Sequence, residues 1–96
     1  MSVPGTETTI TSEAYYQHLL LDIRQHLAVQ LGRVLNEISA QDRLIEDLGV
    51  DSLELADVLV MLETQHAISV PVDAVARLDT VAALADAAVT CAAQHG

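Results

Sequence analysis

Residues 48–63 of the chain read LGVDSLELADVLVMLE. The helical period of this stretch predicts a helix that Ser52 opens, with a hydroxyl suited to capping, and that runs to about His66. On a helical wheel, the face predicted to point inward holds Leu55, Val58, Leu59, Leu62 and His66. The opposite face holds Leu53, Ala56, Asp57, Val60, Glu63 and Thr64. An apolar strip rimmed by carboxylates is typical of a docking surface for a basic partner, although a helix buried on two sides has the same pattern.

A long amphipathic helix is predicted upstream, from Ser12 as its N-cap to a stop at Gly32. Between Gly32 and Asp51 the periodicity weakens, and we expect a long ordered loop with a short helical turn near Leu44 to Leu48. Six apolar residues are the expected anchors of this loop: Val34, Leu35, Ile38, Leu44, Ile45 and Leu48. A loop of this length in a small domain is more often functional than a simple connector.

Two further helices are predicted after Pro71, which forces the preceding residues out of helical geometry. Asp73 is the expected cap of a short helix over residues 74–77, and Asp79 or Thr80 that of a last helix. The inward residues of the last helix are expected to be Val81, Leu84, Ala85, Ala88 and Val89. No strand is needed, so the fold class is all-α, a four-helix bundle with three longer helices, one short helix and a long loop between the first and second.

The composition agrees with a single small domain. The chain has 96 residues, 51% of them hydrophobic, and a formal net charge of −10, which is enough apolar surface for one modest core. Residues 1–11 are expected to form a flexible tail and residues 12–94 the domain. Without a membrane span or signal peptide, the chain is expected to be cytoplasmic and monomeric, and its acidic charge argues against nucleic acid and membrane partners.

Other chemistry-bearing residues suggest no site of their own. Cys91 is alone, so it forms no intramolecular disulfide, and with His95 it lacks an orienting third group; a small packing side chain is the better interpretation. The acidic run of Asp42, Glu46, Asp47 and Asp51 does not have the spacing of a calcium loop, which favours a solvated face. We therefore expect neither catalytic residues nor a metal site.

The start of the helix at Ser52 suits an anion, because free backbone N–H groups and the helix dipole favour a phosphate ester there. With its flanks, the stretch from Leu48 to Glu63 resembles the modification motif and recognition helix of the acyl carrier protein family, the phosphopantetheine-binding carriers. Val70-Pro71 and residues 78–81, LDTV, are also similar to the family. The resemblance spans about two-thirds of the chain without gaps.

The resemblance implies an acyl-carrier-like bundle in which Ser52 receives 4′-phosphopantetheine from coenzyme A, transferred by a separate Mg²⁺-dependent phosphopantetheinyl transferase. The chain itself would catalyse nothing and would present thioesters to an acyltransferase or ligase, a ketosynthase and other enzymes with basic patches. Its expected partner-binding residues are Asp51, Leu53, Glu54, Ala56, Asp57, Val60 and Glu63. An acyl chain would shelter against the inward aliphatic face.

Departures from the family pattern bear on the pathway. His66 stands where an apolar or aromatic residue is usual, which suggests a looser end of the bundle around a partly exposed packing histidine. Together with the N-terminal extension and the absence of Lys, this favours a discrete carrier of type II polyketide or other secondary-metabolite assembly. Alternatives are a primary fatty-acid carrier, a peptidyl or aminoacyl carrier and, in a different class, an unmodified acidic helical interaction module.

Overall fold

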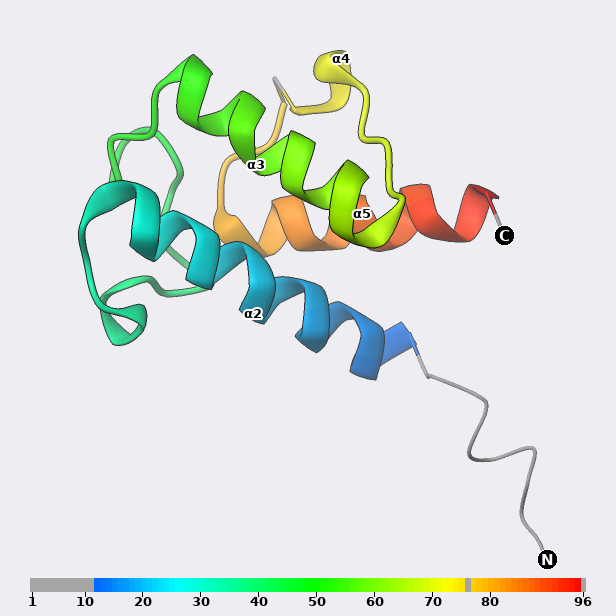
Figure 1. Cartoon of the computed structure of the whole chain (residues 1–96), viewed down its shortest axis with the longest axis horizontal. Helices are drawn as coiled ribbons and strands as arrows, with labels where there is room; N and C mark the ends of the chain where they lie inside the picture. Colours follow the sequence, from blue (N-terminus) through cyan, green and yellow to red (C-terminus); the bar gives the residue numbers. More distant parts are fainter. Residues whose placement is uncertain (1–11, 76, 96) are drawn as a thin grey trace, which may run out of the picture.

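The computed structural model describes residues 12–75 and 77–95, which form an all-helical fold (Figure 1). The helices are α2 (Ser12–Leu31), α3 (Ser52–His66), α4 (Val72–Val75) and α5 (Val81–His95), with one 3₁₀ turn, η1 (Leu35–Glu37). Within this part of the chain there is no strand, only a single antiparallel bridge between Arg43 and Thr80. The predicted class of three longer helices and one short helix is confirmed. No helix among the described residues is long and apolar enough to cross a membrane.

Helix α2 is the central element, because it packs against α3, α5 and η1. Gly32 ends it in the left-handed region, with φ at +66°. The Gly32 N–H donates to the Val29 carbonyl at 3.3 Å and the Arg33 N–H to the Ala28 carbonyl at 2.9 Å, which is the bonding of a Schellman motif. The predicted stop at Gly32 is therefore correct for a conformational reason that favours glycine.

The core is aliphatic. Its fully buried large side chains come from all three longer helices and two connecting segments: Leu19, Ile23, Leu27, Ile38, Val58, Leu62, Ile68, Val81 and Leu84. Tyr15 and Tyr16 are only partly buried at its edge. At about 25 cal/mol per Å² of apolar surface, burial of such side chains is the main stabilising contribution. The core therefore depends on close packing of branched side chains rather than on aromatic rings.

The loop between α2 and α3 is ordered, but only part of its predicted anchoring is correct. Ile38, Leu44 and Leu48 are buried, whereas Val34 and Ile45 are 65% and 69% exposed. A helical turn at 44–48 is present, since the Gly49 N–H donates to the Ile45 carbonyl at 3.0 Å. The turn η1 was not predicted.

Two sets of hydrogen bonds hold this loop to the helices. Arg24 on α2 donates through Nε to the Ile38 carbonyl at 2.6 Å and through Nη2 to the Leu35 carbonyl at 3.2 Å. Towards α5, the Leu44 N–H donates to the Asp79 carbonyl at 2.8 Å. Arg24 has no place in a hydrophobic pattern, so periodicity alone could not assign it this role.

The later helices differ in detail from the prediction. Helix α4 covers Val72–Val75 rather than residues 74–77, so Asp73 lies inside it and is not its cap. Its backbone starts from Pro71, whose carbonyl accepts from the Ala74 and Val75 N–H groups. Of the two candidate caps of α5, Thr80 is the one used, because its Oγ1 accepts from the Ala83 N–H at 3.1 Å.

Candidate functional site

The start of α3 is capped by Asp51, not by Ser52 as predicted. The Asp51 Oδ1 accepts from the Glu54 N–H at 2.7 Å, and Glu54 Oε1 accepts from the Asp51 N–H at 3.0 Å. These reciprocal bonds form a capping box. Asp51 has the extended backbone of a cap, with φ −95° and ψ 178°, and a carboxylate at this end of a helix also interacts favourably with the dipole.

Ser52 is consequently free for another role. It is the first residue of α3 and is exposed. Its hydroxyl makes no hydrogen bond within the described part of the chain. The first backbone N–H groups of a helix have no intrahelical acceptor, and they stabilise an anion placed beside them. The geometry therefore fits a phosphate ester on the Ser52 oxygen.

Two buried side chains fix the backbone that leads into Ser52. Leu48 and Val50 are buried at 3% and 4% exposure, and the Val50 N–H donates to the Leu44 carbonyl at 2.9 Å. Gly49 between them has φ +70°, and no atom would contact a Cβ at that position. Two buried aliphatic side chains thus hold the backbone in place while Ser52 points outward.

Helix α3 has the two faces that the helical wheel predicted. Val58 and Leu62 are fully buried, while Leu55, Leu59 and His66 are half-buried. On the outward face Leu53 is 80% exposed and Val60 is 52% exposed. The other members of that face are also exposed: Ala56, Asp57, Glu63 and Thr64. Met61, which the wheel did not assign, is buried.

Two residues of α2 join this face and were missed in the sequence. His26 Nε2 lies 3.0 Å from Asp57 Oδ2. Gln30, one turn later on α2, donates to the same Asp57 oxygen at 3.1 Å and to the Glu54 carbonyl at 3.0 Å. Their spacing of four residues puts them on one side of α2, but nothing in the sequence pairs them with Asp57, which is 27 and 31 residues away.

The acidic run before α3 is a set of local caps and ion pairs. Arg43 donates from its backbone and its guanidinium to the Asp47 carboxylate at 2.7 to 3.3 Å and also pairs with Glu46. The hydrogen bonds from Arg43 lower the pKa of Asp47, and the hydrogen bond to Asp47 raises the pKa of Arg43. Asp42 accepts from the Ser39 N–H at 2.9 Å. These groups lie at the surface, as predicted, with their charges partly used in turns.

Comparison of the sequence with known proteins assigns the chain to a family. The sequence model of the family described as "Phosphopantetheine attachment site" matches residues 22–88. The chain belongs to the acyl carrier protein family. It is 32% identical over 65 residues to the "Acyl carrier protein" of Exiguobacterium sp. strain AT1b, covering 68% of this chain and 82% of that protein, and to that of Exiguobacterium sibiricum with the same identity and coverage. The protein of the same name from Rickettsia bellii is 34% identical over 56 residues, 58% of this chain and 65% of that protein.

Membership of the family confirms the coarse functional predictions. The chain is an acyl carrier protein with a covalently attached 4′-phosphopantetheine group, and such proteins are non-catalytic carriers. The matched residues include all of α3 and the loop before it. An exposed hydroxyl at a helix N-terminus, without a hydrogen bond to any other described residue, is the feature of this carrier that fits such a group.

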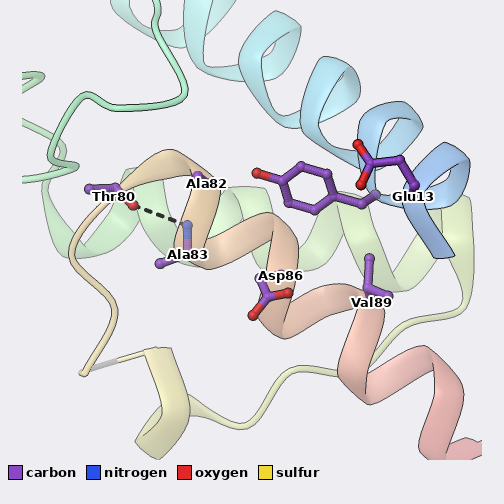
Figure 2. Close-up of a pocket in the computed structure, with 7 residues that line it drawn as sticks. Glu13, Thr80, Ala82, Ala83, Asp86 and Val89 are labelled. Carbon is purple, nitrogen blue, oxygen red and sulfur yellow. Dashed lines mark hydrogen bonds between the residues drawn. The ribbon is translucent and has the colours of Figure 1, made fainter.

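An open pocket of about 510 Å³ lies elsewhere on the carrier, between α2 and α5. Figure 2 shows Glu13 on α2 facing a row of α5 residues that includes Asp86 and Val89, with Thr80 at the start of that helix. No residue of α3 lines it, and two carboxylates do. The pocket is therefore not the surface around Ser52, and shelter of the acyl chain in the core stays a prediction.

Two other predictions concern residues near the helix ends. Cys91 is partly buried and packs against the core, as expected of a small packing side chain; the side chain of His95 lies outside the described residues. His66 does not leave a loose end. Its side chain is only 12% exposed and its Nε2 lies 2.7 Å from Asp22 Oδ2 on α2, so a polar pair holds the end of α3 against α2.

Proposed function

We propose that Ser52 is the attachment point of the 4′-phosphopantetheine group. In this step the Ser52 oxygen attacks the phosphorus of coenzyme A that bears the pantetheine arm. A phosphodiester forms, adenosine 3′,5′-bisphosphate leaves, and the serine proton passes to a base of a Mg²⁺-dependent phosphopantetheinyl transferase. The observation that carries the proposal is the division of roles at the helix start: Asp51 caps α3, so the exposed Ser52 hydroxyl has no structural duty.

The outward face of α3 is the surface that we propose partner enzymes read. Its members are Asp51, Leu53, Glu54, Ala56, Asp57, Val60 and Glu63. Two large exposed apolar side chains, Leu53 and Val60, stand among carboxylates. A partner with a basic patch and a hydrophobic notch would neutralise the acids and cover the apolar side chains.

We also propose a cargo and a pathway for this carrier. The chain would act as a monomeric, cytoplasmic carrier over residues 12–94, presenting acyl thioesters to a ligase or acyltransferase, a ketosynthase and modifying enzymes. Residues 1–11 and the absence of Lys support a dedicated carrier of type II polyketide or other secondary-metabolite assembly over a primary fatty-acid or a peptidyl carrier.

Intact-mass measurement tests the attachment. The folded chain is incubated with coenzyme A, Mg²⁺ and a broad-specificity phosphopantetheinyl transferase, beside Ser52→Ala and the matched control Ser69→Ala, which changes another exposed serine. We expect one phosphopantetheine on the wild type and on Ser69→Ala and none on Ser52→Ala. A gain of mass on Ser52→Ala would refute the site. No gain on the wild type, with a reference carrier modified in parallel, would also overturn the assignment of Ser52 as the acceptor.

A further inference from the structure

A cluster of metal-ligating side chains lies at the opposite end of α3 from Ser52. His66, the last residue of α3, meets His18 and Asp22, which are one turn apart on α2. The Asp22 Oδ2 lies 2.7 Å from His66 Nε2 and 3.7 Å from His18 Nε2. In the described part of the chain, these are the three residues whose ligand atoms come together in such a group, all within 4.8 Å of one another.

The spacing of these atoms is close to that of a metal site. Ligands about 2.0 to 2.1 Å from a tetrahedral Zn²⁺ are about 3.3 Å apart. The two distances to Asp22 Oδ2 lie on either side of this value, so small side-chain rotations bring both imidazoles into place. Imidazole nitrogen and carboxylate oxygen are ligands that zinc accepts together, and a fourth position stays open to water.

The three side chains differ in exposure, so that two of them are held in place and the third is accessible to an ion from solvent. His66 is 12% exposed, Asp22 is 25% exposed and His18 is 61% exposed. The two less exposed ligands are held by their mutual contact, while the exposed one leaves a route for an ion. The rings of His18 and His66 are edge to face, with centroids 5.6 Å apart and planes at 81°.

We propose that His18, Asp22 and His66 form a zinc(II) site that links α2 to the end of α3. The site is independent of the attachment of phosphopantetheine, because the 15 residues of α3 place Ser52 about 20 Å away at 1.5 Å per residue. The net charge of −10 raises the local concentration of divalent cations. The sequence predicted no metal site, because the third ligand is 44 residues from Asp22.

A hydrogen-bonded His66–Asp22 pair alone is the simpler interpretation, and the carrier contains an internal comparison for it. His26 and Asp57 form a similar pair, 3.0 Å apart, between the same two helices. That pair is not part of any group of three metal-ligating side chains among the described residues. Zinc binding at a three-ligand site is therefore weakened when His18 is removed, whereas binding by the His66–Asp22 pair alone is not. Loss of His26 affects neither.

Titration calorimetry of the full chain with ZnCl₂ tests the proposal. It is done at about pH 7.5, where neutral imidazole is available, in excess Mg²⁺ to occupy carboxylates that bind only hard cations. We expect one saturable site, weakened at least about tenfold in His18→Ala and unchanged in His26→Gln and in Cys91→Ser. The Cys91→Ser chain that carries phosphopantetheine is expected to show the same single zinc site once the thiol of the arm has been alkylated, because no thiol is then left to bind zinc.

A second measurement uses the wild type alone. Zinc is expected to shift the imidazole NMR signals of His18 and His66 together at one equivalent, while those of His26 stay in place. Full-strength zinc binding in folded His18→Ala, equal weakening in His26→Gln, or uniform shifts of all histidines would overturn the site and leave only the His66–Asp22 pair.

Discussion

At the scale of single residues, the start of α3 separates a structural duty from a chemical one. Asp51 supplies the cap that a helix needs, and the neighbouring Ser52 keeps its hydroxyl in solvent. A serine that capped the helix would have to give up that bond before modification, at a cost of about 1 kcal/mol. With Asp51 as the cap, modification of Ser52 leaves the helix start intact.

This separation predicts unequal effects on stability. Asp51→Ala removes the carboxylate that accepts from Glu54 and is expected to lower the free energy of unfolding by about 1 kcal/mol. Ser52→Ala is expected to change it by less than about 0.5 kcal/mol, because the exposed hydroxyl has no hydrogen bond to the described part of the chain. Urea unfolding monitored by circular dichroism measures both, and an equal loss in the two variants would contradict the assignment of the cap.

The Arg43–Asp47 pair predicts a dependence of stability on pH. The pKa of Asp47 is lowered in the folded chain from its ordinary value of 3.8, so the unfolded chain binds more protons between the two values. The pair therefore stabilises the fold above about pH 4, and this contribution is lost as the pH falls through the lowered folded pKa.

Comparison with Asp47→Asn isolates this effect. The wild type is expected to be more stable at pH 7, and the difference is expected to shrink as the pH falls below about 4 and with added salt, because the pair is exposed. The measurement is urea unfolding of both proteins from pH 7 to pH 3. A difference that stays constant over this range would show that the carboxylate charge is not responsible.

At the scale of elements, α3 uses its two faces for different purposes. Val58 is fully buried against the core, whereas Val60, two residues later, is 52% exposed among the acids. The same side chain therefore contributes to packing in one position and to a surface in the other. Helical periodicity alone accounts for this difference.

The same substitution at these two valines separates the faces. Val58→Ala leaves a cavity in the core and is expected to cost about 2 kcal/mol of unfolding free energy. Val60→Ala is expected to cost less than about 0.5 kcal/mol but to raise the KM for phosphopantetheinyl transferase severalfold by removing an apolar contact. Thermal unfolding and transferase kinetics give the two readouts, and an unchanged KM in Val60→Ala would remove this residue from the docking face.

At the scale of the whole molecule, the dominant property is charge. The chain has fourteen acidic residues and only four arginines. Among the described residues, Arg43 is already paired with Glu46 and Asp47. Such a surface attracts basic partners over distances longer than any single contact. Salt screens this attraction, with a Debye length of about 10 Å at 0.1 M.

Transferase kinetics test this attraction. The kcat/KM for modification is expected to fall about tenfold between about 50 and 500 mM NaCl. Glu63→Gln on the docking face is expected to weaken the dependence on salt, whereas Asp86→Asn, an exposed carboxylate on α5, leaves it unchanged. Equal effects of the two variants would mean that net charge matters and the position of the carboxylate does not.

The agreement between sequence and structure depends on the range of the interactions involved. Periodicity and end signals predicted α2, α3 and the faces of α3, since these rest on neighbours three or four residues apart. The predictions failed where two nearby residues compete for one role, as Asp51 and Ser52 do for the cap, and in the loop, where Val34 and Ile45 are exposed although they are as apolar as the buried Ile38.

The 96 residues therefore contain, in their local pattern, the helices, the aliphatic core face, the acidic outward face and the motif around Ser52. The pairing of distant positions required the folded chain: Arg24 with the loop carbonyls, His26 and Gln30 with Asp57, and His18 and Asp22 with His66. The physical reason is that helical propensity and amphipathicity act between near neighbours along the chain. These contacts of polar side chains with groups 11 to 48 residues away along the chain depend on how the helices and the loop pack, and local periodicity contains no information on that packing.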